Sequence, residues 1–269
     1  MRYFGLFALF MAVNALALCG CATVPVSQRR QLSLIPSQQL TSLSNQSYDK
    51  IISESTLSKD PQKVEMVERV GRGIAAATED FLKNIGREEE LANYEWEFVL
   101  IEDNEQANAF CMPGGKVAVY TGILPFTKDE TGLAVVLAHE AAHAIANHGG
   151  ERLSQLLLIQ LGQITLALAL REKPEETQRL AYIAYGVTST VGVILPYSRT
   201  HEREADRIGL IIMAKAGYDP REAIAFWERM KEQEKIRPPE FLSTHPVPES
   251  RIEDIKRNIP EAMRYYKKN

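Results

Sequence analysis

Residues 139–143 read His-Glu-Ala-Ala-His, and this run limits the possible folds of the chain more than any other feature. On an α-helix, side chains four residues apart lie on one face, one turn from each other. His139 and His143 can therefore bind one metal ion, with Glu140 beside them to accept a proton from a water molecule. The run lies within the apolar stretch 133–146, where these polar groups would be costly to bury without a partner such as a metal ion. We therefore expect a helix that supplies two zinc ligands, rather than an amphipathic helix with two structural histidines.

A third ligand must come from elsewhere, because catalytic zinc binds three protein groups and keeps its fourth position for water. A third histidine six residues after His143 is excluded, since that position is a glycine. Residues 202–206 read Glu-Arg-Glu-Ala-Asp and place Glu202 and Asp206 on one helix face. Glu202 could bind zinc while Asp206 hydrogen-bonds a ligand imidazole. Glu204 is the alternative ligand, but it has no acidic residue one turn further on.

The remaining patterns predict an α+β, mainly α domain with a small antiparallel β-sheet beside the zinc-binding helix. Asp60 before Pro61 is a typical helix start. Thr127 with Glu130 predicts a capping box before the helix that carries the motif. The expected elements are helices at 61–85, 128–147, 153–170, 181–195, 219–234 and from 248, strands at 94–101 and 116–121, and a hairpin turn at 113–115 with two short flanking strands.

Two of these helices, 153–170 and 181–195, are very apolar and are separated by a charged turn. Gln155, Gln160 and Gln163 interrupt the first of them and favour buried or partly wet helices over membrane spans. We therefore expect both helices to lie in a core, with a pair that dips into a membrane as the alternative.

The first twenty residues differ from the rest of the chain. Arg2 is followed by an almost wholly apolar stretch to residue 18, as in a secretory signal. The stretch ends in Leu18-Cys19-Gly20-Cys21, which resembles a bacterial lipobox with Cys21 as the acylated residue. Expected domains are a lipoprotein signal peptide at 1–20, a lipidated N-terminus and tether at 21–36, and one zinc metallopeptidase domain at 37–269. A plain signal peptide and an uncleaved anchor remain as alternatives.

Composition excludes some classes of function. The net charge of the chain is -4, and no block of Lys and Arg is visible, so we expect no nucleic-acid partner. Loss of residues 1–20 would leave two cysteines, Cys21 and Cys111. If Cys21 is acylated, Cys111 is the one free thiol and cannot form an internal disulfide. Stability must then come from the hydrophobic core.

Beyond the zinc motif, the chain resembles the HtpX-like, CAAX-prenyl-endopeptidase-type zinc metallopeptidases, which are gluzincins. The resemblance covers most of the chain, from about residue 32 to residue 251. It is closest to the soluble periplasmic branch, near outer-membrane quality-control lipoproteins and a mitochondrial stress protease. The matching segments are 108–110, 113–115, 139–143, 151–152, 197–199, 202–206 with Gly209, 216–220 and 243–246.

The resemblance implies further roles. Asn108, Ala109, Phe110, Gly114 and Gly115 would form the edge strand and turn that bind an extended substrate, with an ordinary hairpin arm as the alternative. In the same family a histidine approaches the metal, and His245 before Pro246 matches it. This histidine could block the fourth zinc position, assist the reaction, or lie on the surface. His148 and His201 are expected to be structural.

The combined hypothesis is a membrane-tethered zinc metalloendopeptidase with one Zn²⁺ per chain, held by His139, His143 and Glu202. Glu140 would act as the base that activates water. Expected substrates are misfolded or unassembled cell-envelope proteins bound in extended form, with envelope assembly machinery as a candidate partner. The expected location is the periplasmic side of a bacterial cell envelope, lipid-anchored at the outer membrane. The alternative is a chaperone or assembly factor that uses the groove without cleavage.

Overall fold

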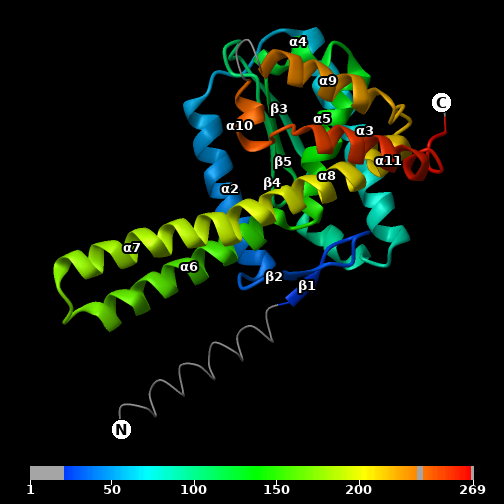
Figure 1. Cartoon of the computed structure of the whole chain (residues 1–269). Coiled ribbons are helices and arrows are strands. Elements are labelled where there is room, and N and C mark those ends of the chain that lie inside the picture. Colours follow the sequence, from blue (N-terminus) through cyan, green and yellow to red (C-terminus); the bar gives the residue numbers. More distant parts are fainter. Residues whose placement is uncertain (1–20, 235–238, 268–269) are drawn as a thin grey trace. The chain divides into compact units, whose positions relative to one another are not determined.

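The computed structural model describes residues 21–234 and 239–267, and these residues form two compact units (Figure 1). The first unit contains the described chain up to Ser37 together with Asn147–His201. The second contains Gln38–Ala146 and the chain from Glu202 onward. The expected signal peptide, residues 1–20, lies outside the described residues.

The second unit is mainly helical, as predicted, and includes a small sheet. Its helices are α2 (Ser37–Glu54), α3 (Pro61–Asn84), α4 (Leu124–Thr127), α5 (Glu130–Ile145), most of α8 (Leu195–Lys215), α9 (Glu222–Glu234), α10 (Glu240–Thr244) and α11 (Glu249–Ala262). Two short 3₁₀ turns, Glu88–Asn93 and Thr121–Ile123, connect the elements around the strands.

Helix starts follow the capping chemistry of the sequence at one site and differ from it at another. Asp60 caps α3 as predicted, and its side chain accepts hydrogen bonds from the backbone N–H groups of Gln62 and Lys63. The predicted capping box of α5 is wrong: Asp129 is the N-cap and accepts from the N–H of Gly132. Thr127 instead ends α4 and donates its hydroxyl hydrogen to the carbonyl of Leu124. Thr127 and Asp129 lie two residues apart, and both residue types favour the N-cap position; here Thr127 belongs to α4 and Asp129 takes the cap.

The sheet has three strands, in the order β3 (Glu97–Ile101), β5 (Lys116–Tyr120) and β4 (Ala109–Met112). β4 and β5 form the predicted antiparallel hairpin, joined by a turn in which Gly114 and Gly115 have φ of +99° and +87°. β3 and β5 are parallel, so the expectation of a purely antiparallel sheet is wrong. After β3 the chain forms β4 at the far edge of the sheet, and β5 then pairs with both strands between them. β4 is therefore an edge strand of the described sheet.

α5 is buried on nearly all sides, which places the metal-binding motif inside the second unit. Its apolar residues, such as Leu133, Val136 and Ala138, are fully inaccessible to solvent. A helix that is apolar all round must be covered by other elements, and here α3, β4 and α9 pack against it. Burying one large aliphatic side chain contributes roughly 1.5–3 kcal/mol, so this helix is held firmly in place.

The first unit contains β1 (Cys21–Thr23) paired with β2 (Arg30–Leu32), and α6 (His148–Leu170) packed against α7 (Glu175–Ser189). A π-helical segment, Thr190–Ile194, leads from α7 into α8. The residues expected to form a tether thus include two paired strands.

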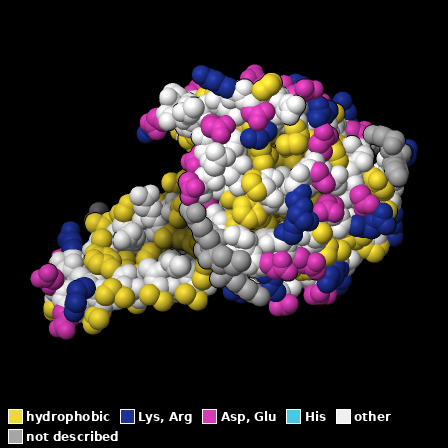
Figure 2. Space-filling view, turned by 90° about the horizontal axis from the view of Figure 1, so that it is seen from above, with side chains coloured by type: hydrophobic (Ala, Val, Ile, Leu, Met, Phe, Trp, Pro, Cys, Tyr) yellow, Lys and Arg dark blue, Asp and Glu magenta, His cyan; other side chains and the backbone are white. Residues whose placement is uncertain are grey.

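The expectation that the two apolar helices lie in a core is wrong. Leu161 is 57 % exposed and Leu168 is 65 % exposed. Figure 2 shows hydrophobic side chains along the α6–α7 hairpin and charged side chains at its tip. By length and composition, two helical segments of the described chain could cross a membrane, His148–Leu170 and Glu175–Lys215.

Candidate metal centre

Four potential ligands converge on one point of the second unit. α5 supplies His139 and His143, α8 supplies Glu202, and the residue after α10 is His245. The Nε2 atoms of His139 and His143 lie 3.1 Å apart, and Glu202 oxygens lie 3.3 Å from each of them. Nδ1 of His245 lies 3.1 Å from Nε2 of His139 and 3.0 Å from Oε2 of Glu202.

This spacing fits a tetrahedral ion. Ligands about 2.0–2.1 Å from zinc stand roughly 3.3 Å from each other at tetrahedral angles. The nitrogen and carboxylate donor set is also the one that zinc prefers. A cation at the centre would stabilise four such groups buried together. The convergence of His139, His143 and Glu202 is typical of the zincin fold, as the sequence predicted.

The other candidate ligands and histidines of the sequence do not belong to this cluster of the described residues. Among the described residues, the cluster able to hold a metal includes Glu202 and not Glu204. His201 accordingly does not join the cluster, and its Nε2 lies 2.8 Å from Oε2 of Glu151 within the first unit. His148 stacks on His201 with ring centroids 4.3 Å apart. Both histidines therefore take part in a separate polar cluster.

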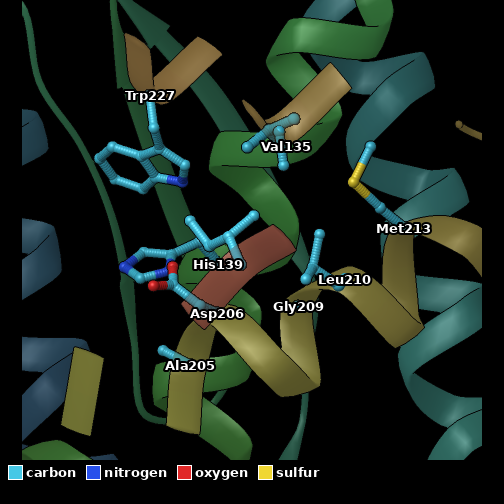
Figure 3. A pocket seen from close by; sticks show the side chains of 10 residues that line it. Val135, His139, Ala205, Asp206, Gly209, Leu210, Met213 and Trp227 are labelled. Carbon is cyan, nitrogen blue, oxygen red and sulfur yellow. The ribbon is translucent and has the colours of Figure 1, made fainter. Parts of the chain in front are cut away.

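Asp206 lies one helical turn after Glu202, behind His139. Its Oδ1 is 3.0 Å from Nδ1 of His139, and Figure 3 shows this carboxylate beside the His139 ring. The other ring nitrogen, Nε2, faces the ligand cluster. A carboxylate at this atom keeps the hydrogen on Nδ1 and leaves Nε2 free to bind a metal. Burial alone would raise the pKa of Asp206, but the Arg251 guanidinium lowers it below its usual value. Asp206 is thus a carboxylate that can orient the ring.

Gly209 allows the two metal-binding helices to approach closely. A Cβ at this position would lie 3.1 Å from both the carbonyl oxygen of Ala138 and the backbone nitrogen of His139. Beside this contact is a cavity of about 10 Å³, lined mainly by apolar side chains such as Val135 and Met213 (Figure 3). That volume is at most the space of one water molecule. The support behind His139 is therefore almost completely packed.

Arg251 is a residue of this site that the sequence reasoning missed. It is 3 % exposed, and its Nε and Nη2 donate to the two oxygens of Asp206 at 2.8 and 2.9 Å. Its Nη1 lies 3.0 Å from Oε2 of Glu202. The guanidinium also stacks 3.8 Å from the ring centroid of Trp227. Arg251 thus offsets the negative charges of two carboxylates, the metal ligand Glu202 and Asp206, which orients His139.

The same guanidinium holds the segment that carries His245. Nη1 of Arg251 donates to the carbonyl oxygens of His245 and Pro246, at 3.2 and 3.1 Å. The ring of His245 stacks on Phe241, with centroids 4.5 Å apart. These contacts fix the imidazole against the ligand cluster. No local pattern around Arg251 signalled this role, since its partners are up to 112 residues away in the chain.

Glu140 faces the same cluster from α5. It is 4 % exposed, and its Oε1 lies 3.4 Å from Nε2 of His245. Burial raises its pKa above the usual value, and a hydrogen bond from the backbone N–H of Cys111 opposes that shift. β4, which contains Cys111, therefore runs beside Glu140. Burial and the Glu140 charge raise the pKa of the Cys111 thiol, and the described metal cluster does not include this residue.

Comparison with known proteins agrees with this geometry. The sequence model of peptidase family M48 matches residues 68–259. The mitochondrial metalloendopeptidase OMA1 of Schizosaccharomyces pombe is 34 % identical over 242 residues, which are 89 % of this chain and 67 % of the relative. Human OMA1 is 36 % identical over 61 % of this chain and 32 % of the relative.

A bacterial relative is the β-barrel assembly-enhancing protease of Escherichia coli K12, with 34 % identity over 62 % of this chain and 35 % of the relative. This chain therefore spans between about a third and two thirds of the relatives named here. The resemblance inferred from the sequence motifs is confirmed. The chain belongs to peptidase family M48, and His139, His143 and Glu202 form its metal site.

Proposed function

We propose that this chain is a zinc metalloendopeptidase with one Zn²⁺ held by His139, His143 and Glu202. The observation that carries the proposal is the convergence of these three ligands beside the buried carboxylate of Glu140. A zinc ion held by these residues would lower the pKa of a water molecule to about 7 and would polarise the carbonyl of a peptide bond. Glu140 would accept the proton of that water, a role supported by its buried carboxylate, which faces the ligand cluster.

Replacing the base tests this mechanism. Glu140→Gln should keep about one zinc per chain but lose cleavage of unfolded casein by about 10²-fold or more, because general-base catalysis contributes 10²–10⁴-fold. Glu204→Gln, on the neighbouring helix and outside the ligand cluster, is the matched control and should keep both properties. Metal content would be measured by mass spectrometry of the purified protein. Full activity of Glu140→Gln would refute the mechanism, and a wild type that suppresses aggregation without cleavage would favour a chaperone.

The substrate is proposed to bind as an extra strand along β4. An edge strand offers backbone groups to an extended peptide, and β4 both lies at the edge of the described sheet and runs beside Glu140. Asn108, Ala109 and Phe110 would contact the peptide, while Gly114 and Gly115 form the turn. Peptides N-methylated at alternate residues should be cleaved poorly at one register only, since strand pairing repeats every two residues. Equal cleavage in both registers would argue against strand addition.

His245 is proposed to restrain the enzyme by occupying the fourth metal position. Its Nδ1 lies as close to the ligand atoms as they lie to one another. A site closed by four protein groups leaves no place for water. Apparent activity would then scale with the fraction of molecules in which His245 has withdrawn.

The location is proposed to be the periplasmic side of a bacterial outer membrane, with a lipid on Cys21 after removal of residues 1–20. This proposal rests on the apolar leader and the Leu-Cys-Gly-Cys sequence. Labelled palmitate should enter the wild type and Cys19→Ser but not Cys21→Ser. An unmodified N-terminus by mass spectrometry would refute it. The proposed substrates are misfolded or unassembled envelope proteins. The proposed partner is the envelope assembly machinery.

A further inference from the structure

The α6–α7 hairpin exposes more large apolar side chains than its own packing can cover. On α6, Leu161, Ile164 and Leu168 recur at helical spacing and are 54–65 % exposed. On α7 and the segment after it, the corresponding exposed residues are Leu180, Ile183, Val187 and Val191. Contiguous exposed apolar surface of this extent marks a site of protein or membrane interaction.

The distribution of these side chains around α6 favours lipid over a protein groove. Leu156, Leu157 and Leu158 are consecutive and all exposed. Successive residues on a helix are about 100° apart, so these three point in widely different directions. A protein groove covers one face of a helix, whereas lipid chains can surround it. Figure 2 shows the hydrophobic side chains extending along the hairpin.

The N-terminal segment is fixed to the base of the same hairpin. Arg29 donates two hydrogen bonds to Glu151 of α6, at 2.8 and 2.7 Å. The backbone N–H of Leu34 donates to the hydroxyl of Ser154 at 3.0 Å. The chain that follows the apolar leader therefore enters the unit that contains the hairpin. One unit thus combines the membrane-directed end of the chain with the exposed apolar helices.

Length and charge limit the depth of insertion. The apolar part of α6, residues 156–170, is roughly 22 Å long at about 1.5 Å per residue, less than the ~30 Å of a hydrocarbon core. The turn beyond it carries Arg171, Glu172, Lys173, Glu175 and Glu176, all exposed. Moving each such charge to the bilayer centre costs about 2.5–3.5 kcal/mol or more. The turn therefore remains at the level of the headgroups.

We infer that the α6–α7 hairpin lies along one leaflet of a lipid bilayer, with its apolar side chains among the acyl chains and its charged turn at the headgroups, and forms a second attachment besides the N-terminus. Insertion removes the exposed leucine and isoleucine side chains from water and leaves the charged turn hydrated. The inference concerns the first unit alone and does not depend on the metal centre.

A tryptophan placed on the hairpin tests the inference in the full-length protein. Leu168→Trp would be mixed with vesicles of phosphatidylethanolamine and phosphatidylglycerol that contain a phosphatidylcholine brominated in its acyl chains. The native Trp96 and Trp227 lie in the second unit, whereas the substituted position lies in the first. Their emission is present in the parent protein as well, so subtracting the parent spectrum leaves the emission of the added tryptophan. The added emission should shift to shorter wavelength and be largely quenched. Leu43→Trp, at a position 51 % exposed on α2, is the matched control and should show neither change.

A charge on the same face provides the second variant. Leu161→Glu in the Leu168→Trp protein should abolish the quenching while circular dichroism and metal content stay unchanged. Unquenched emission from the added tryptophan, in protein that floats with the vesicles, would overturn the inference. So would a dimer in sedimentation experiments without lipid that Leu161→Glu dissociates, because the hairpin would then bind a second copy of the chain.

Discussion

Replacing Arg251 with methionine should strongly destabilise the second unit, because it leaves the buried carboxylate of Asp206 without its cation and removes a positive charge from beside Glu202. The side chains of Arg251 and Asp206 are each 3 % exposed and share two hydrogen bonds, and Glu202 lies 3.0 Å from the same guanidinium. Removing one partner of such a buried pair costs about 3–5 kcal/mol. For a domain of this size, the midpoint of thermal unfolding should fall by about 10 °C.

A second arginine pair between the same two helices is the control. Arg207 of α8 donates to both oxygens of Glu261 in α11, at 2.7 and 2.9 Å. The two side chains are 38 % and 33 % exposed, so Arg207→Met should cost only about 0.2–1 kcal/mol. Stability would be measured by urea unfolding, with and without added Zn²⁺.

A double variant isolates the charge effect. Asp206→Asn together with Arg251→Met removes both charges of the pair and should be less destabilised than the sum of the two single variants. If Arg251→Met costs no more than Arg207→Met, burial does not govern the strength of these pairs, and the reasoning is refuted.

The remaining predictions concern the metal, the restraint and the N-terminal cluster. Glu202→Gln should lose zinc while Glu204→Gln retains it, as measured by metal analysis; the reverse result would move the third ligand. His245→Ala should keep zinc and raise cleavage of unfolded casein if the histidine blocks the site. Loss of activity would show that it assists the reaction, and an unchanged rate would remove it from the mechanism. Burial alone would raise the pKa of Glu151, but Arg29 and His201 lower it to about 2. The unfolded chain therefore binds more protons between about pH 4.5 and pH 2, and the stability that this carboxylate contributes is present above that window and lost as the pH falls through it. The difference in urea midpoint between the wild type and Glu151→Gln should accordingly be largest at pH 7 and shrink below about pH 4.5; a constant difference would contradict the assignment.

Local sequence patterns predicted where helices and strands form, but they predicted less well what surrounds each element. The Asp60-Pro61 start, the β4–β5 hairpin and the helix with His139 and His143 all depend on neighbouring residues, and all are present. The parallel pairing of β3 with β5 was missed, because pairing depends on how a connection crosses the sheet. The apolar helices α6 and α7 were expected in a core, since periodicity reports that a helix is apolar but not what covers it.

The sequence by itself determined the chemistry of the metal site. Two histidines one helical turn apart, with a glutamate between them, have few functions other than metal binding. The spacing of Glu202 and Asp206 indicates a third ligand and a carboxylate that supports a ligand histidine. Only the tertiary structure decided which distant groups complete the site. Arg251 and His245 reach His139 from more than a hundred residues away, and such contacts follow from the packing of α8, α10 and α11 around α5. That packing reflects the burial of many apolar side chains at once, which no short segment of the chain encodes.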